Sequence, residues 1–131
     1  MRSGSPDTIP AGPEVDQLLA TALAEDLGER GDITSAAVLD PRAPAAVSLV
    51  SRAEGVLAGM PFVERLFALH APGVEVRVLA FDGARVRPNE RLAVFSGKAG
   101  EILALERTAL NLLQRLSGIA PLTARFVAAA G

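Results

Sequence analysis

The chain has 131 residues and half of them are hydrophobic, so it is about one domain long and carries enough apolar material for a core. Zero cysteines exclude a disulfide framework and any thiolate metal or redox site, and the single histidine, His70, excludes a site built from several histidines. The net charge of −2 gives no electrostatic case for binding nucleic acid or a membrane surface.

The first residues, "MRSGSPDTIPAGP", have no apolar run after Arg2, so we expect neither a signal peptide nor an anchor. Residues 1–12 are rich in Ser, Gly and Pro, and this composition predicts a disordered lead-in. No stretch reaches the roughly 18 consecutive apolar residues of a membrane span. Together with the lack of cysteine, these features favour a cytoplasmic protein.

Pro13 suits the first turn of a helix, and the apolar spacing after it predicts a helix over 13–27. The residues that mark its apolar face are Val15, Leu18, Leu19, Ala22, Leu23 and Leu27. The segment "GERGDITS" then predicts a turn, in which Asp32, Thr34 and Ser35 are available to hydrogen-bond local backbone amides. We interpret these three polar residues as caps.

Residues 45–58 predict two short strands separated at Glu54-Gly55. Pro61 then opens a second predicted helix, and His70 is interpreted as a structural residue at its end. The apolar residues predicted to share or border the stripe of this helix are Phe62, Val63, Leu66, Phe67 and Leu69.

The run "VEVRVLA" alternates apolar and polar residues and predicts a half-buried strand. The segment "FDGARVRPNERLAVFSG" follows, with turns predicted at Asp82-Gly83 and Pro88-Asn89. It resembles the hammerhead turns of biotinyl and lipoyl carrier domains, but neither turn contains the lysine that such carriers modify. We therefore take from this resemblance only an architecture, a small barrel-like sandwich.

Residues 101–118 predict a helix with one core-facing stripe, formed by Ile102, Leu105, Ala109, Leu112, Leu113 and Leu116. Its opposite side carries a narrow polar line edged by leucines, formed by Arg107, Asn111, Gln114 and Gly118 beside Leu103 and Leu110. A line this narrow is typical of a partly covered surface. After a break at 118–121, "LTARFVAAA" predicts a last helix, and the element order indicates an α+β fold.

Read in order, "ALAEDLGERGDITS", "SRAEGVLAG", "FDGARVRPNERLAVFSG" and "ERTALNLLQRLSGIA" are similar to the N-terminal part of quinolinate phosphoribosyltransferases, over about residues 15–131. The resemblance implies an N-terminal α/β-sandwich domain over 13–118, in which a barrel-like hammerhead β-unit is flanked by helices. It also implies that 119–131 begins the segment leading to the family's C-terminal β/α barrel, which this sequence lacks.

The reaction implied by the resemblance converts quinolinate and phosphoribosyl pyrophosphate into nicotinate mononucleotide, carbon dioxide and pyrophosphate, in the de novo synthesis of NAD. Mg²⁺ is expected to bind with phosphoribosyl pyrophosphate through ligands of the barrel, so we expect no metal ligand and no catalytic residue in these 131 residues. The resemblance further implies a homodimer, or a hexamer of dimers, in which this domain caps the partner's barrel.

The arginine of the family's Glu-Arg-Thr element corresponds to Arg107, which is therefore expected to bind a carboxylate of quinolinate. Asn111 and Gln114 are expected to position Arg107 or to line the dimer contact. Pro121 departs from the family pattern, because a small hydroxyl residue is usual at this position.

Because the barrel is absent from the sequence, we expect the isolated chain to be inactive. Two alternatives remain open at this point. One is a related molybdenum-associated pyrophosphorylase with a different aromatic substrate. The other is a non-catalytic domain that uses the leucine-edged polar line for dimerisation.

Overall fold

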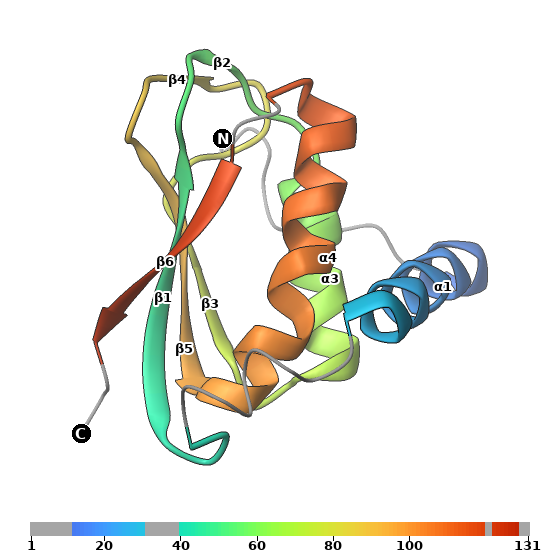
Figure 1. Cartoon of the computed structure of the whole chain (residues 1–131). Helices are drawn as coiled ribbons and strands as arrows, with labels where there is room; N and C mark the ends of the chain where they lie inside the picture. The colour runs from blue at the N-terminus through green and yellow to red at the C-terminus, as the bar shows by residue number, and fades with distance from the viewer. Residues whose placement is uncertain (1–11, 31–39, 120–121, 129–131) are drawn as a thin grey trace.

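The computed structural model describes residues 12–30, 40–119 and 122–128, which form one sheet with helices packed on one of its faces (Figure 1). In chain order the elements are α1 (Pro13–Arg30), β1 (Pro44–Ser51), β2 (Gly55–Val56), α3 (Met60–His70), β3 (Glu75–Val78), β4 (Arg85–Val86), β5 (Arg91–Lys98), α4 (Ala99–Ser117) and β6 (Leu122–Ala128). The predicted lead-in, apart from Gly12, and the predicted caps Asp32, Thr34 and Ser35 lie outside the described residues.

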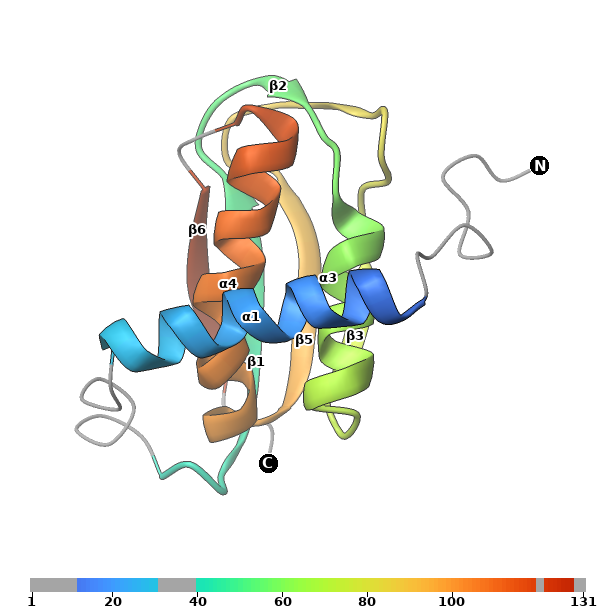
Figure 2. The same cartoon turned by 90° about the vertical axis from the view of Figure 1, so that its right-hand side faces the viewer.

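The main sheet has the strand order β3-β5-β1-β6, and every neighbouring pair in it is antiparallel. β2 and β4 form a separate two-stranded ribbon. Helices α3 and α4 cover one face of the main sheet, and α1 crosses over them as an outer layer (Figure 2). The α+β class is thus confirmed. Within the predicted β-unit, β5 joins the main sheet while β4 pairs with β2.

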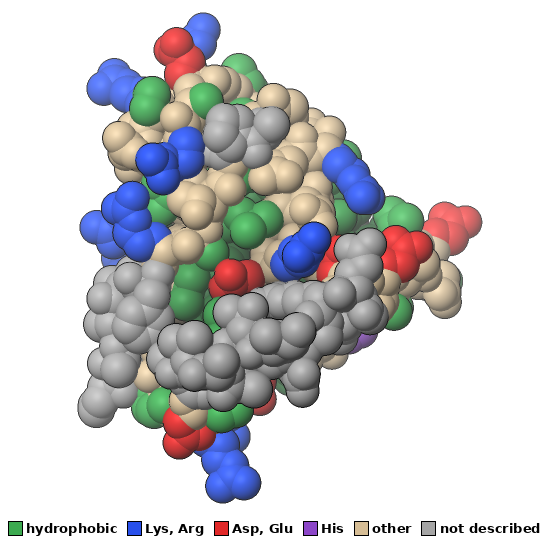
Figure 3. Space-filling model, viewed as in Figure 1, with side chains coloured by type: hydrophobic (Ala, Val, Ile, Leu, Met, Phe, Trp, Pro, Cys, Tyr) green, Lys and Arg blue, Asp and Glu red, His purple; other side chains and the backbone are tan. Residues whose placement is uncertain are grey.

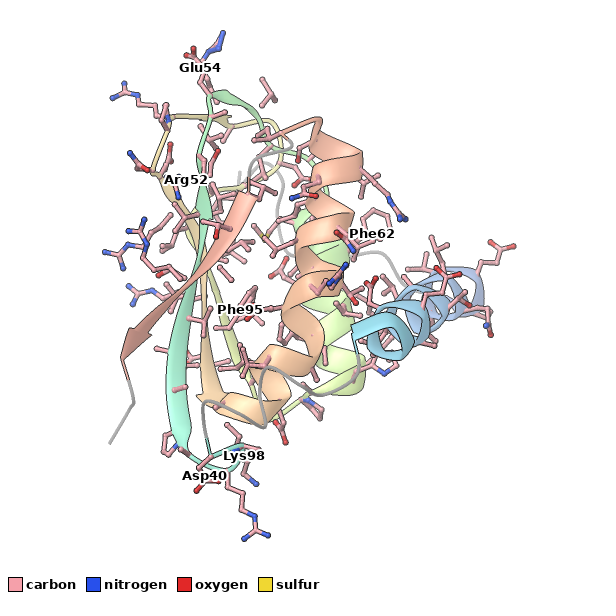
Figure 4. All side chains as sticks on the ribbon, in the orientation of Figure 1. Asp40, Arg52, Glu54, Phe62, Phe95 and Lys98 are labelled. Atoms are coloured by element: carbon pink, nitrogen blue, oxygen red, sulfur yellow. The ribbon has the colours of Figure 1, made fainter. Side chains whose placement is uncertain are left out.

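The core lies between the sheet and the two helices, and the ring of Phe67 in α3 stacks on Phe95 in β5 with ring centroids 4.5 Å apart. Phe95 points from the sheet toward the helices (Figure 4). The α4 stripe is confirmed except at Leu116, which is 48% exposed in the last turn.

Two other leucines of the predicted stripes are also exposed. Leu69 is 37% exposed because it lies in the last turn of α3, at the edge of the helix layer that packs on the sheet. Leu18 is 59% exposed because α1 crosses α3 and α4 and buries only a narrow strip of its own surface. Leu19 and Leu23 lie in this buried strip. Burial of a helical stripe therefore depends on where the neighbouring element ends.

The final run predicted as a helix is instead strand β6, which pairs antiparallel with β1. The register sets Leu122 opposite Ser51 and Ala124 opposite Leu49. The alanines of "LTARFVAAA" favour a helix, but Thr123 and the apolar residues at alternate positions suit a strand. The unpaired edge of β1 decides the outcome, because it offers backbone hydrogen bonds that a helix in this segment would leave unmade.

The ends of two helices also differ from the sequence prediction. α1 continues through Gly28 to Arg30, and α4 begins at Ala99 and ends at Ser117, where Gly118 adopts the left-handed conformation (φ 77°). Glycine is the residue that takes this conformation with least strain. None of the described helices has the length and apolar content needed to cross a membrane.

Candidate functional site

Helix α4 presents Arg107 at the protein surface, while Thr108 and Ala109, directly after it, are fully buried. Leu103 and Leu110, the leucines beside the polar line, are partly buried, as are Asn111 and Gln114. The surface on both sides of the exposed Arg107 is thus half-buried. Because the opposite side of α4 is fixed in the core, the backbone that carries Arg107 is held by a buried helix face.

A carboxylate of α1 contacts α4 next to Arg107. The Thr108 hydroxyl donates to Asp26 Oδ2 at 2.6 Å, and the Asn111 amide donates to Asp26 Oδ1 at 3.3 Å. The sequence pattern alone singles out neither Asp26 nor Thr108, and it does not indicate this contact of Asn111. A buried threonine hydroxyl needs a hydrogen-bond acceptor, but the burial of Thr108 becomes known only from the structure.

A narrow crevice follows the line between α1 and α4. It is lined by Ala22, Glu25, Asp26, Thr108, Asn111, Leu112 and Arg115. In Figure 3, acidic side chains gather over α1 and Lys and Arg side chains lie mainly along the sheet side of the same face. The crevice thus carries two carboxylates from α1 and one guanidinium, Arg115, from α4, and Arg107 is not among its lining residues.

The other end of α1 is fixed to α3 by an ion pair. Arg65 donates from Nε and Nη2 to the two carboxylate oxygens of Asp16, each at 3.0 Å. These hydrogen bonds from Arg65 hold the pKa of Asp16 below its ordinary value. Carboxylates near both ends of α1 therefore fasten it across the two helices that lie on the sheet.

The C-terminal end of α4 is fastened to the start of α3. The Ser117 hydroxyl donates to the Ala58 carbonyl at 2.7 Å and accepts from the Ala58 N–H at 2.9 Å. At the same place Asp82 accepts from the N–H groups of Gly59 and Met60, both at 2.9 Å. These contacts fix the relative position of the two helices at one end.

Among the described residues, no three His, Cys, Asp or Glu side chains gather as metal ligands. The described part of the chain therefore does not fit a resident Mg²⁺ site, and we assign no step to a metal held by these residues. His70 is the last residue of α3 and is exposed, in agreement with its interpretation as a helix-end residue.

The structure is a sheet with helices on one face, in which α4 packs one side on the core and presents Arg107 at the surface. A guanidinium is a side chain able to bind an anion through several N–H donors. Residues 32–117 match the protein family described as quinolinate phosphoribosyl transferase, N-terminal domain, and the chain belongs to this family. The match includes Arg107, Thr108 and Asn111.

Two curated relatives illustrate the similarity. The chain is 40% identical over 116 residues to the probable nicotinate-nucleotide pyrophosphorylase [carboxylating] of Synechocystis sp., covering 88% of this chain and 38% of that protein. It is 33% identical over 123 residues to the mitochondrial quinolinate phosphoribosyltransferase [decarboxylating] 2b of Nicotiana tabacum, covering 92% of this chain and 35% of that protein. The chain thus spans less than half the length of the curated relatives that it matches.

Solved structures agree with this assignment. The crystal structure of NadC from Streptococcus pyogenes superposes with a TM-score of 0.73 at 35% identity, over 86% of this chain and 40% of that one. The nicotinate-nucleotide pyrophosphorylase of Francisella tularensis gives a TM-score of 0.69 at 28% identity, over 81% of this chain and 37% of that one. The observed fold is therefore that of the corresponding part of these proteins.

Proposed function

We propose that this chain is the N-terminal portion of a quinolinate phosphoribosyltransferase, which makes nicotinate mononucleotide, carbon dioxide and pyrophosphate from quinolinate and phosphoribosyl pyrophosphate in de novo NAD biosynthesis. The observation that carries the proposal is the exposed Arg107, presented by the buried helix α4 inside the region that matches the family. The names of the Synechocystis and Nicotiana relatives supply the reaction.

In this function Arg107 binds one carboxylate of quinolinate. A guanidinium offers a planar fork of N–H donors that matches a carboxylate bidentately, which an ammonium cannot do. The role of the chain is to bind and orient the substrate. Mg²⁺ enters as part of the substrate, on phosphoribosyl pyrophosphate, and the catalytic groups and magnesium ligands lie outside the described residues.

The active assembly in this proposal is a homodimer in the cytoplasm, in which the domain covers the partner's barrel and supplies Arg107 to the partner's site. Because one arginine cannot hold magnesium pyrophosphate and stabilise the charge that develops during the reaction, the isolated chain has no turnover. Measurable conversion of quinolinate by the purified chain would contradict this part of the proposal.

A chimera tests the function directly. The chain replaces the matched region of the Synechocystis relative, and formation of nicotinate mononucleotide is measured at varied quinolinate and varied phosphoribosyl pyrophosphate. We expect turnover in the chimera and a rise of about ten- to a hundredfold in the KM for quinolinate in Arg107→Ala, since a charge-assisted contact worth roughly 1.5–3 kcal/mol is lost. The KM for phosphoribosyl pyrophosphate should change little.

Two controls make this test specific. Arg107→Lys should recover only part of the quinolinate affinity, because the charge remains and the fork does not. Arg77→Ala removes an exposed arginine of β3 on the sheet and should leave both KM values unchanged. A folded chimera without turnover, or an Arg107→Ala effect equal for both substrates, would refute the assignment.

Mixed dimers test whether the contact is made between subunits. Arg107→Ala subunits are combined with subunits disabled in the barrel of the Synechocystis part. Turnover should return, because one site of each mixed dimer then takes its arginine from one subunit and its barrel from the other. If mixed dimers form and turnover stays absent, Arg107 acts within its own subunit or does not contact substrate.

A further inference from the structure

Asp26 of α1 accepts hydrogen bonds from two side chains of α4, Thr108 and Asn111, in the helical turn that follows Arg107. Thr108 follows Arg107 directly, and Asn111 lies one turn further along α4. Asp26 lies in the motif "AEDLG". Thr108 and Asn111 lie in the motif "ERTALN", 82 and 85 residues further along the chain. The fold therefore brings two distant motifs together at one contact beside the ligand-binding arginine.

The contact is specific in geometry and chemistry. At 2.6 Å the hydrogen bond from the Thr108 hydroxyl to the Asp26 carboxylate is short. Thr108 is fully buried, so its hydroxyl would lose its partner without Asp26 and could not exchange it for bulk water. Asp26 itself is half-buried and holds α1 and α4 together at this one point.

The position of α1 follows from this contact. Asp16 fastens the first half of α1 to α3, and Asp26 fastens the C-terminal half of α1 to α4. Figure 2 shows α1 crossing over both helices. Because Asp26 binds Thr108, the residue directly after Arg107, the C-terminal half of α1 is fixed beside the helical turn of α4 that bears Arg107.

We propose that Asp26, held by Thr108 and Asn111, is a positioning residue that fixes α1 beside Arg107 and so limits the directions in which Arg107 can reach its ligand. The proposal rests on the proposed function, because it takes the ligand to be a carboxylate of quinolinate. A guanidinium that binds a rigid planar dicarboxylate bidentately must arrive in one orientation, and small misplacements of such groups are costly.

The isolated chain offers a direct test of whether the C-terminal half of α1 lies beside Arg107. Because the chain has no cysteine, Glu25→Cys provides a single attachment point for a spin label on α1 next to Asp26. We expect the label to broaden the Arg107 Nε–H signal strongly and the Arg77 signal weakly. Thr108→Val should remove most of the Arg107 broadening, whereas Thr108→Ser should keep it. Unchanged broadening in Thr108→Val would overturn the proposal.

The kinetic test uses the chimera defined above. Thr108→Val should raise the KM for quinolinate about tenfold and leave the KM for phosphoribosyl pyrophosphate within about twofold, because only the orientation of Arg107 is lost. Thr108→Ser should rescue the KM. If Thr108→Val does not fold, Asn111→Ala removes the second donor to Asp26 more mildly and should shift the same KM in the same direction.

A matched control separates positioning from general stability. Asp16→Ala removes the other side-chain link of α1, away from Arg107, and should lower the unfolding temperature without raising the KM for quinolinate. An equal rise of the KM in Asp16→Ala and Thr108→Val would overturn the positioning role, because any loosening of α1 would then suffice.

A double-mutant cycle distinguishes the two proposals. In the Arg107→Ala background, Thr108→Val should have no further effect on the KM for quinolinate, because the group that it positions is gone. If Arg107→Ala has no effect by itself, the proposed function of Arg107 fails. If Arg107→Ala has its effect and Thr108→Val has none, only the positioning role of Asp26 fails.

Discussion

Helices α3 and α4 lie side by side on the same face of the sheet, yet their polar side chains have different tasks (Figures 1 and 2). The side-chain links of α3 close within the domain: Asp82 binds its first N–H groups, and Arg65 binds Asp16 of α1. α4 makes such links through Thr108 and Asn111, and directly before Thr108 it presents Arg107 at the surface. The same helix thus combines internal side-chain links with an exposed arginine.

The two helices also begin differently. The start of α3 is satisfied by a side chain, the Asp82 carboxylate. Lys98, at the start of α4, makes no capping side-chain bond, and the N–H groups of Ala99 and Gly100 donate to the carbonyls of Ala43 and Pro41, each at 2.8 Å. Asp40 and Lys98 accordingly lie at the same end of the molecule (Figure 4). The start of α4 therefore depends on the close approach of a backbone segment.

The largest effect should come from the core that both helices share. Phe67→Ala removes the ring stacked on Phe95 and should lower the free energy of unfolding by about 3–5 kcal/mol, and Leu113→Ala in α4 should cost about 2–5 kcal/mol. Urea denaturation of the isolated chain measures both. If only one of the two variants is destabilised, the helices do not share a single cooperative core.

The start of α4 gives the second effect. Alanine normally favours a helix over glycine by about 1 kcal/mol. A Cβ at Gly100, however, would lie 2.7 Å from Pro41 Cβ and 3.1 Å from the Pro41 carbonyl oxygen. We expect Gly100→Ala to destabilise the chain by about 1–3 kcal/mol in the same denaturation experiment, because the backbone segment at Pro41 must move.

A glycine substitution in α3 provides the control. Ala68 is exposed, so Ala68→Gly should show only the loss of helix propensity, about 1 kcal/mol. A stabilising effect of Gly100→Ala would mean that the segment at Pro41 yields freely and does not hold the start of α4.

The sequence predicts those features of α3 and α4 that depend on a single helix. The spacing of Ile102, Leu105 and Ala109 fixes which side of α4 is buried, and the outward position of Arg107 follows from it. The exposure of Leu116 does not follow, because periodicity does not tell where the packing neighbour of a helix ends.

Contacts between elements that lie far apart in the chain could not be predicted from the sequence. Asp26 and Thr108 each look like ordinary helix residues until the fold sets one against the other. The strand β6 likewise depends on a free edge of β1, and local propensity in "LTARFVAAA" carries no information about that edge. The family resemblance pointed to Arg107, but it said nothing of the residues that hold α1 beside it.

The start of α3 gives the third effect. Asp82→Ala leaves the N–H groups of Gly59 and Met60 without their acceptor and should cost about 1–2 kcal/mol. Burial raises the pKa of Glu64, and the nearby Asp82 carboxylate raises it further, so this variant should also lower the Glu64 pKa, as measured by NMR titration. Asp40→Ala, which removes an exposed local acceptor, should cost less. An equal cost for both variants would argue against a special role of the cap.

The smallest effect should come from the link between α1 and α3. Hydrogen bonds from Arg65 lower the pKa of Asp16 from its ordinary value of 3.8, so the folded state favours the ionised carboxylate. The stability that this pair contributes is fully present above the unfolded pKa and is lost as the pH falls through the folded one. Asp16→Asn should therefore lower the urea midpoint near neutral pH and have a vanishing effect in strong acid.

Among the described carboxylates, the pKa of Asp16 is lowered and that of Glu64 is raised, so their contributions to stability change with pH in opposite directions. Comparing single variants is therefore more informative than the pH curve of the wild type alone. The raised pKa of Glu64 means that its contribution is lost as the pH rises through the folded value. The contributions of Asp16 and Glu64 are separated by measuring urea midpoints from about pH 7 to about pH 3 for the wild type, Asp16→Asn and Glu64→Gln. Because the ion pair is solvated, added salt should weaken the Asp16 effect. An Asp16 effect that grows toward acid pH would mean that Arg65 does not hold the ionised carboxylate, and the link between α1 and α3 would then not depend on this ion pair.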